Sequence, residues 1–582
     1  MNYRHFKYES WLYALAFLIA LAVRLIGLGT LPLNDAEAQL ALQSLQLADG
    51  LKPALGPHPA YILFTMPLFF LYGGGTNFLA RLIPALIGSA LVFAPLLFAN
   101  RLKPRPSLLL AFFLALDPGM VAISRQVGSP ILALTFFVFA WGFWNQNKPR
   151  LFASFGALAL LGGPSIWAGL LGLGITWAIR QGLEFRPAKA EDESVVLDQA
   201  DGSGVKPEVM PVEVQSRNPI FTTEILSTFA VTFIAAGTLF FVVPNGLSAA
   251  LASIPAYLIH WIVPSPMQPG WMLVSLLAYQ PFAVLLASIA TIRGWVRGSR
   301  RVIPLSVWFL VAFLLAIFQP GRQMADLAWA LLPLLGMAAL ELTRNVDVFP
   351  EERIEVFGTT MLTAFLWGFG WLNFLSVVWL APGYEKYNLY TLLVFGSLFL
   401  LLLSLVLVAF GWSIHVAQRG AIWGLGLALG VLGLAGAMGV SGLHGISRPE
   451  LWWQPKIPAQ ANLLEATVRE VSEWGVGHDD ALPVLIYGVD SPALEWVLRE
   501  HNPIQVDSLD VSTAPALVVS NYEDNPNLSA SYRGQDFTWR LTTSWEIAKT
   551  PDWFRWLAYR EMPQSGEIIV LWARNDLFFD SK

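Results

Sequence analysis

Two carboxylates, Asp35 and Glu37, stand two residues apart just after the first long apolar run of the chain. A pair of this kind can supply a general base and a supporting acid. The same pattern also begins helices, because an Asp N-cap and a Glu in the first turn satisfy free backbone N–H groups and the helix dipole. Spacing alone leaves both interpretations open.

Several cationic residues fall in segments predicted to face the same side of a membrane as this pair. Arg125 and Arg322 are candidates for binding phosphate, because a guanidinium fork matches two phosphate oxygens. Each also fits a simpler role, in which the side chain extends to the lipid headgroups. Lys52 and His58 lie in the same loop as the carboxylates and are further candidates for donor binding.

A metal site is a separate hypothesis. Imidazole and carboxylate suit zinc and other divalent ions, so Glu37, His58 and His260 are the candidate ligands. No His pair has the His-x-x-x-His spacing of a helical metal site. The alternative for both histidines is a hydrogen-bonded anchor at the membrane interface.

The composition indicates the class of protein that carries these residues. Of the 582 residues, 55% are hydrophobic and 13% are charged, against roughly 25% charged residues in soluble chains. The chain is therefore predicted to be an integral membrane protein. Its net charge of −5, without a basic segment, argues against a nucleic-acid partner. The absence of cysteine excludes disulfides and thiolate chemistry.

Apolar runs long enough to cross a bilayer predict a polytopic helical bundle. Arg4 and Lys7 precede the first run and place the amino terminus in the cytoplasm. Arg293, Arg297, Arg301 and other basic residues then fall in the cytoplasmic loops, as the positive-inside rule requires. We predict about 13 spans, near residues 11–28, 79–99, 107–123, 131–146, 151–163, 166–180, 220–243, 272–290, 302–318, 327–342, 356–380, 389–410 and 420–443.

Residues 1–443 are thus the expected membrane domain. The segment 31–78 forms its first outer loop, with interfacial helices that include the short apolar run 61–72. The segment 181–219 is acidic, contains Gly and Pro, and lacks apolar periodicity, so we predict a disordered cytoplasmic loop.

The remaining residues, 444–582, have ordinary soluble composition and are numerous enough for one extracytoplasmic domain. Strand patterns at 482–487, 516–520 and 567–572, with a helix at 491–500, predict a small α/β unit. The fold class is therefore mainly α, a multi-pass bundle in the plasma membrane with a C-terminal α/β domain outside.

Short motifs in the first part of the chain occur in an informative order. They are Asn34-Asp35-Ala36-Glu37, Gly56-Pro57-His58-Pro59, Ala80-Arg81-Leu82-Ile83-Pro84-Ala85-Leu86 and Ile123-Ser124-Arg125. In this order they resemble the GT-C glycosyltransferases, and within them the branch of the protein O-mannosyltransferases and the lipid A aminoarabinose transferase. The resemblance covers about the first 180 residues, and Gly321-Arg322 before a span with Pro333 is a weaker later match.

The resemblance implies an inverting hexosyl or pentosyl transfer from a polyprenyl-phosphate donor to a glycan, lipid or protein acceptor at the outer membrane face. The acceptor hydroxyl attacks the anomeric carbon while the lipid phosphate leaves. A carboxylate must take or orient the proton, and cations must stabilise the phosphate. Asp35 matches the catalytic Asp of the family, and Glu37 would support it. No cofactor is certain, and a divalent metal is the one that the residues suggest.

One departure from the family motivates an alternative. The family commonly has a second Asp a few residues after the Arg that Arg125 matches, and Ser129 stands near that position. A serine cannot serve as a charged acid, although Asp117 is close in sequence. The alternative is a non-catalytic GT-C-like protein that assists the flipping or handover of a lipid-linked sugar. An ion-coupled transporter is disfavoured, because the sequence has no internal repeat.

Overall fold

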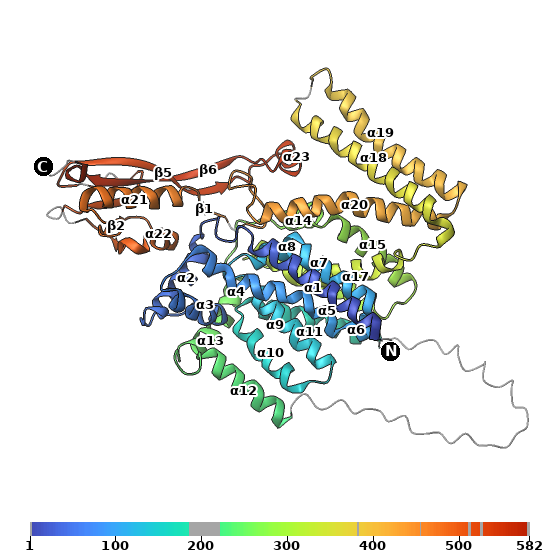
Figure 1. Ribbon diagram of the computed structural model, residues 1–582, viewed down its shortest axis with the longest axis horizontal. Helices are drawn as coiled ribbons and strands as arrows, with labels where there is room; N and C mark the ends of the chain where they lie inside the picture. Colours follow the sequence, from blue (N-terminus) through green and yellow to red (C-terminus); the bar gives the residue numbers. More distant parts are fainter. Residues whose placement is uncertain are drawn as a thin grey trace, which may run out of the picture.

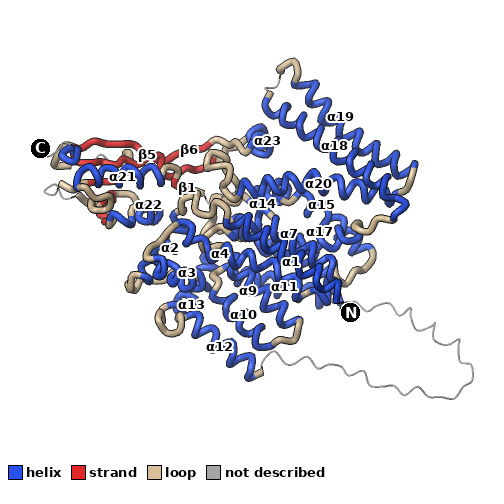
Figure 2. Tube along the Cα trace, in the orientation of Figure 1, coloured by secondary structure: helices blue, strands red, loops and turns tan. Residues whose placement is uncertain are grey.

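The computed structural model describes residues 3–184, 222–380, 383–453, 455–509, 514–523, 526 and 528–578. Helices make up most of it, and a mixed β-sheet lies at one end (Figures 1 and 2). The predicted disordered loop over 181–219 lies outside the described residues, except for residues 181–184, which end a helix.

The amino-terminal part of the bundle is a series of apolar helices, four of which begin with proline. Proline suits the first helical position, because the N–H that it lacks would have no partner there. The helices are α1 (Tyr3–Leu25), α2 (Asp35–Ala48), α3 (Pro59–Tyr72), α4 (Asn77–Ala90), α5 (Ala94–Leu97), α6 (Ala99–Leu102), α7 (Pro104–Leu116), α8 (Pro118–Ser124), α9 (Ile131–Asn145), α10 (Pro149–Leu161) and α11 (Ser165–Glu184).

The second part of the bundle follows the undescribed segment. It contains α12 (Thr223–Gly237), α13 (Gly246–Ile259), α14 (Pro269–Tyr279), α15 (Pro281–Val296), α16 (Val302–Phe318), η2 (Met324–Leu327), α17 (Ala328–Arg344), η3 (Pro350–Glu352), α18 (Arg353–Trp379), α19 (Tyr387–Gly411) and α20 (Ile414–Val440).

Two of the predicted spans are broken. The segment predicted at 107–123 bends by 58° between α7 and α8, and the one predicted at 272–290 bends by 97° between α14 and α15. Pro118 and Pro281 follow the two breaks, where each ring removes a backbone donor and prevents a continuous helix.

Helix length identifies only some of the spans. Within the described residues, five helices are long and apolar enough to cross a membrane, or seven if each bent pair counts as one span. Other apolar helices, among them α9, α10 and α16, are shorter than 18 residues. The bundle is therefore that of a membrane protein, and the count of about 13 spans stays a prediction.

The C-terminal sheet has six strands in the order β1-β5-β6-β4-β2-β3. Strand β2 pairs in parallel with β3 and β4, and the other pairs are antiparallel. The strands are β1 (Ile457–Pro458), β2 (Val484–Tyr487), β3 (Ile504–Val506), β4 (Leu517–Asn521), β5 (Tyr532–Thr543) and β6 (Gln564–Arg574).

Three helices accompany the sheet: α21 (Ala461–Val476), α22 (Pro492–Val497) and α23 (Thr550–Tyr559). Strands β2, β4 and β6 and helix α22 occupy the positions predicted from the sequence. The predicted helix at 491–500 ends early, at Val497, and a 3₁₀ turn continues it to His501. The long strand β5 was not predicted, although Phe537, Trp539 and Leu541 alternate with polar residues in its second half.

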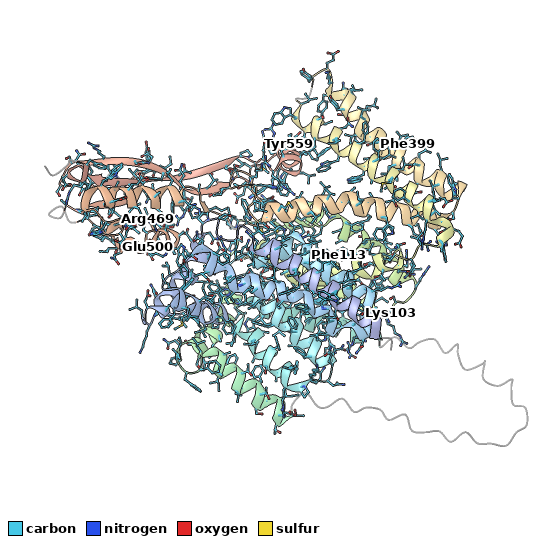
Figure 3. All side chains as sticks on the ribbon, in the orientation of Figure 1. Lys103, Phe113, Phe399, Arg469, Glu500 and Tyr559 are labelled. Carbon is cyan, nitrogen blue, oxygen red and sulfur yellow. The ribbon has the colours of Figure 1, made fainter. Side chains whose placement is uncertain are left out.

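The helices that accompany the sheet contact one end of the bundle directly. The Trp496 indole of α22 donates a hydrogen bond to Asn77 at 2.8 Å, and the Tyr559 hydroxyl of α23 donates to the Leu375 carbonyl of α18 at 2.8 Å. We call this the sheet end. Figure 3 shows Lys103 at the other end of the bundle, which we call the opposite end.

Candidate active site

The Asp35–Glu37 segment begins helix α2 with a capping box. Asn34 is the N-cap, and its side-chain oxygen accepts a hydrogen bond from the Glu37 N–H at 3.0 Å. Glu37 accepts in return from the Asn34 N–H at 3.3 Å. The helix-start interpretation of this pattern was therefore right, but the cap is Asn34, where the sequence had suggested Asp35.

Glu37 forms a buried ion pair with Arg81 of α4. The carboxylate oxygens lie 3.1 Å from Nε and 2.6 Å from Nη2, and Glu37 is 1% exposed. Glu37 also accepts from the Val127 N–H at 3.0 Å, and Arg81 donates to the Leu31 and Pro32 carbonyls. The carboxylate of Glu37 thus holds the first loop against α4.

Asp35 faces the C-terminal domain. Its carboxylate accepts hydrogen bonds from the Ser491 hydroxyl at 2.5 Å and from the Ala493 N–H at 3.2 Å. Arg540 of β5 donates to the other oxygen at 2.9 to 3.0 Å. Asp35 therefore joins α2 to the start of α22 and to the sheet.

Arg125 lies at the carboxyl ends of two helices. The last carbonyls of a helix have no partner within it, and the buried guanidinium satisfies several of them. It donates to the carbonyls of Val23, Arg24, Ile26, Gly27 and Ser441. Ser129, in the position where the family has an acid, donates to the Ile123 carbonyl at 2.5 Å. Both side chains thus bind backbone.

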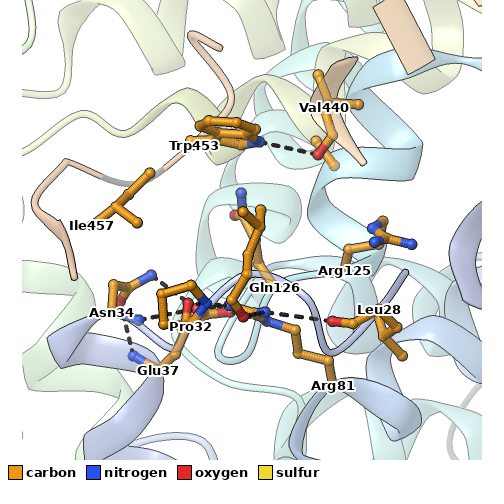
Figure 4. A pocket seen from close by; sticks show the side chains of 12 residues that line it. Leu28, Pro32, Asn34, Glu37, Arg81, Arg125, Gln126, Val440, Trp453 and Ile457 are labelled. Carbon is orange, nitrogen blue, oxygen red and sulfur yellow. Dashed lines mark hydrogen bonds and ion pairs between the residues drawn. The ribbon is translucent and has the colours of Figure 1, made fainter. Parts of the chain in front are cut away.

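Two cavities meet beneath the sheet, and we call them the small and the large cavity. The small cavity, of about 40 Å³, is lined by Asn34, Glu37, Arg81 and Arg125 (Figure 4). The large cavity has a volume of about 530 Å³. The residues that line both are Gln126, Trp453 and Ile457. Asp35 lines neither.

The large cavity combines the groups that a phosphosugar site needs. Arg322 and Lys456 supply positive charge, and Glu450 and Glu546 supply carboxylates. Arg322 is oriented by hydrogen bonds to the Ile317 and Met267 carbonyls, at 3.0 and 2.8 Å. The aromatic residues of the wall are Trp271, Trp452, Trp453 and Trp545. Of the predicted donor-binding residues, the structure brings Arg322 to this cavity.

Glu450 is a cavity residue that sequence reasoning missed. It is 2% exposed, accepts a hydrogen bond from the Tyr279 hydroxyl, and lies 3.5 Å from Nε of Arg560. Arg560 in turn stacks on the rings of Tyr279 and Trp556. Burial raises the pKa of the Glu450 carboxyl, and the Arg560 charge opposes that rise. The only sequence signal was an acid beside a Trp pair just after the last span.

The remaining candidates lie elsewhere. Burial lowers the pKa of the His58 imidazole to about 4, so the ring is neutral at pH 7 and brings no positive charge. Lys52 is exposed and lines neither cavity. Among the described residues, no three His, Cys, Asp or Glu side chains are grouped closely enough to hold a metal ion. Glu37 meets Arg81, and the predicted set with His58 and His260 is not assembled.

Comparison with solved structures identifies the architecture. A crystal structure of ArnT from Cupriavidus metallidurans bound to undecaprenyl phosphate matches over 98% of this chain and 99% of that chain, with a TM-score of 0.54 and 13% identity. The fold is that of the GT-C glycosyltransferases. This confirms the fold that the motif order implied. The match extends to the C-terminal sheet, well beyond the first 180 residues.

Further matches are weaker. The apo structure of the same ArnT has a TM-score of 0.49 at 11% identity, over 88% of this chain and 93% of that chain. The archaeal oligosaccharyltransferase AglB from Archaeoglobus fulgidus, in complex with an inhibitory peptide and a dolichol-phosphate, has a TM-score of 0.34 at 13% identity, over 89% and 70%. No family profile and no curated protein matches the sequence. The activity must therefore be argued from the site.

Proposed function

We propose that this protein is a glycosyltransferase that moves a sugar from a polyprenyl-phosphate donor to an acceptor, and that the reaction takes place in the large cavity. The observation that carries the proposal is this cavity, where Arg322, Lys456 and Glu450 surround a space walled by tryptophans. The GT-C fold supports it, and the ArnT neighbour is a complex with undecaprenyl phosphate.

The reaction leaves negative charge on the phosphate and releases a proton from the acceptor hydroxyl. The cavity contains cations that can stabilise the phosphate and carboxylates that can take the proton. The acceptor oxygen attacks the anomeric carbon, the bond from that carbon to the phosphate oxygen breaks, and the phosphate leaves with the electron pair. Arg322 would stabilise the leaving phosphate through its planar donor fork, with Lys456 as a second cation. The acceptor loses its proton to a carboxylate base.

Two carboxylates compete for the role of base. Asp35 is the residue that the family resemblance implies, and its contacts with Ser491 and Arg540 would have to change for it to reach a substrate. Glu450 lines the large cavity and has a raised pKa, which makes it a stronger base than an ordinary carboxylate. Its contacts with Tyr279 and Arg560 would likewise have to change. The geometry favours Glu450. Glu37 and Arg125 would then act as positioning residues.

The polyprenyl tail needs an apolar path through the bundle. An apolar cavity of about 590 Å³ lies among α9, α10, α11 and α16 and is lined by aromatic side chains, among them Trp141, Trp177 and Trp308. A smaller cavity shares Trp308 with it and reaches Asp326 of η2. Met324 and Ala325 of η2 line the large cavity, so η2 borders both the smaller cavity and the large one.

The orientation belongs to the same proposal. We place the sheet end outside the plasma membrane and the amino terminus in the cytoplasm, so that donor and acceptor meet at the outer face. Arg293, Arg297 and Arg301 would then lie inside, in agreement with the positive-inside rule. Cleavage by a protease added to intact cells, restricted to the C-terminal domain, tests this orientation.

The direct test of function is turnover by the purified full-length protein. Undecaprenyl-phosphate-linked hexose and pentose donors are supplied in detergent with a mixture of glycan, lipid and peptide acceptors. We expect release of the lipid phosphate together with glycosidic product, and a loss of about 100-fold or more in Arg322→Ala. Arg105→Ala, at the opposite end of the bundle, is the matched control.

A second function is favoured by a different observation. Asp35 and Glu37 both bind protein groups, and Ser129 replaces an acid. A protein that binds the lipid-linked sugar and hands it over would need no base. Saturable donor binding by the wild type, without glycosidic product from any donor, would establish this function in place of the transferase.

A further inference from the structure

A cavity of about 300 Å³ lies at the opposite end of the bundle, away from the candidate active site. Its volume is far above the ~10–15 Å³ that one water molecule requires. The charged side chains that line it are Lys103, Arg293, Arg297, Arg301, Arg344 and Glu341. Five cations thus surround one space with a single carboxylate.

Helix ends bring these cations together. Arg293 and Arg297 lie at the carboxyl end of α15, and Arg344 lies at the carboxyl end of α17. The negative ends of helix dipoles stabilise cations, which explains why individual arginines are placed there. Dipoles do not explain why Arg301, before α16, and Lys103, before α7, are directed at the same cavity.

Within the part of the chain that the structure describes, the one carboxylate of the cavity makes a direct ion pair with only one of the five cations, although its charge also attracts Arg344 and Arg297. Arg293 pairs with the buried Glu341 at 2.9 Å. Among the described residues, Lys103, Arg297, Arg301 and Arg344 have no hydrogen bond or ion pair from their side chains. Like charges around one cavity repel each other, and an anion with several oxygens relieves that repulsion. Phosphate has this chemistry, and arginine forks match it.

The surroundings of the cavity indicate which molecule carries the phosphate. On α15, Ile292, Trp295 and Val296 flank the cationic residues and are 68%, 50% and 81% exposed. This stretch of α15 therefore offers apolar surface to lipid beside cations that face the cavity. Tryptophan is also typical of the membrane interface. A soluble phosphate would use the cations and leave the apolar surface without a role.

We infer that this cavity binds the phosphate of an anionic phospholipid, whose acyl chains lie along α15. Basic pockets between membrane helices are suited to such headgroups. The inference does not depend on the glycosyltransferase proposal, since it concerns neither the large cavity nor the sheet end.

The test is a binding titration of the purified full-length protein by native mass spectrometry. Phosphatidylglycerol and phosphatidylcholine with the same acyl chains are compared. The wild type should bind the first phosphatidylglycerol molecule more tightly than phosphatidylcholine. In Arg297→Gln/Arg301→Gln the affinity for phosphatidylglycerol should fall about 30-fold, because each basic residue contributes on the order of 1 kcal/mol. Phosphatidylcholine binding should be unchanged.

Two matched variants separate charge at the cavity from charge in general and from folding. Arg300→Gln/Arg353→Gln removes two arginines that do not line the cavity, and it should retain the preference for phosphatidylglycerol. Arg297→Lys/Arg301→Lys keeps the charge and should retain most of the affinity. All variants are compared with the wild type by melting temperature and elution volume.

The inference is overturned if the wild type does not distinguish the two lipids, or if the Gln pair at the cavity binds phosphatidylglycerol as the wild type does. A third arm separates the sources of phosphate. Inorganic phosphate and glycerol 3-phosphate at millimolar concentration should not displace the bound lipid, because the acyl chains add to its affinity. Displacement by either one would identify a soluble phosphate site and overturn the assignment to a lipid.

Discussion

Asp35 and Arg540 are 505 positions apart in the sequence and form an ion pair of 2.9 Å that joins helix α2 to strand β5. The side chains are 28% and 19% exposed, so solvent screens the pair only in part. The pair lies between the membrane bundle and the C-terminal domain, beside Ser491 at the start of α22. It is one of several contacts that hold the two domains together, with the hydrogen bonds from Trp496 to Asn77 and from Tyr559 to Leu375.

The first prediction concerns docking. Asp35→Asn and Arg540→Gln each break the ion pair, and we expect each to speed amide hydrogen exchange in α22. A double-mutant cycle on stability should give a coupling of about 0.5 to 1 kcal/mol, the range for partly exposed pairs. Zero coupling would show that the pair does not contribute to docking.

The same two variants decide whether Asp35 is the base. Both remove the ion pair, but only Asp35→Asn removes the carboxylate. If both variants lose turnover equally, Asp35 acts through domain docking, and if both retain it, Asp35 has no role in turnover. Loss of turnover in Asp35→Asn alone would establish Asp35 as the base and exclude Glu450 from that role.

The second prediction concerns Glu37 and Arg81. Glu37→Gln leaves the buried Arg81 guanidinium without a counter-charge, and the protein should lose about 3 to 5 kcal/mol of stability. The measurement is chemical or thermal unfolding in detergent. Glu37→Gln/Arg81→Met removes both charges and should recover part of the loss. A single variant as stable as the wild type would contradict the structural role assigned to Glu37.

The third prediction concerns pH. If Glu450 is the base, turnover requires its ionised form, and kcat/KM should rise with pH through the raised pKa, above the usual 4.5. The positive charge of Arg560 holds that pKa down, so Arg560→Gln should move the acidic limb to higher pH. Arg560→Lys keeps the charge and should leave the limb nearly in place. A limb that does not respond to Arg560→Gln would exclude Glu450 as the titrating group.

The same shift affects stability. A carboxyl with a raised pKa binds its proton more tightly in the folded protein than in the unfolded chain. Its contribution to stability is therefore present below pH 4.5 and is lost as the pH rises through the folded pKa. Glu450→Gln should weaken this dependence, which unfolding curves at a series of pH values would detect.

The fourth prediction concerns Arg322. Arg322→Lys retains a positive charge but loses the planar donor fork, so turnover should fall less than in Arg322→Ala. The value of kcat should fall from the wild type to Arg322→Lys and again to Arg322→Ala, because the leaving phosphate gains charge in the transition state. The value of KM should rise in the same order. Equal activity in all three would remove Arg322 from the site.

Features that depend on composition or on residues close together in the chain could be predicted from the sequence. The scarcity of charge predicted the membrane bundle, and the polar start of α2 could be recognised from Asn34 and Glu37, because a capping box depends on residues three apart. Strands β2 and β4 were also predicted, because buried strands are short apolar runs. The order of short motifs indicated the GT-C fold.

Only the tertiary structure decided which partner each charged residue meets. Glu37 meets Arg81 across 44 positions, Asp35 meets Arg540 across 505, and both pairs arise because helices and the sheet pack side by side. Glu450 of the large cavity accepts a hydrogen bond from Tyr279, the last residue of α14, which lies 171 positions before it. The spacing of apolar residues predicts which face of a helix is buried. The residue that a side chain on that face contacts depends on how distant segments fold together.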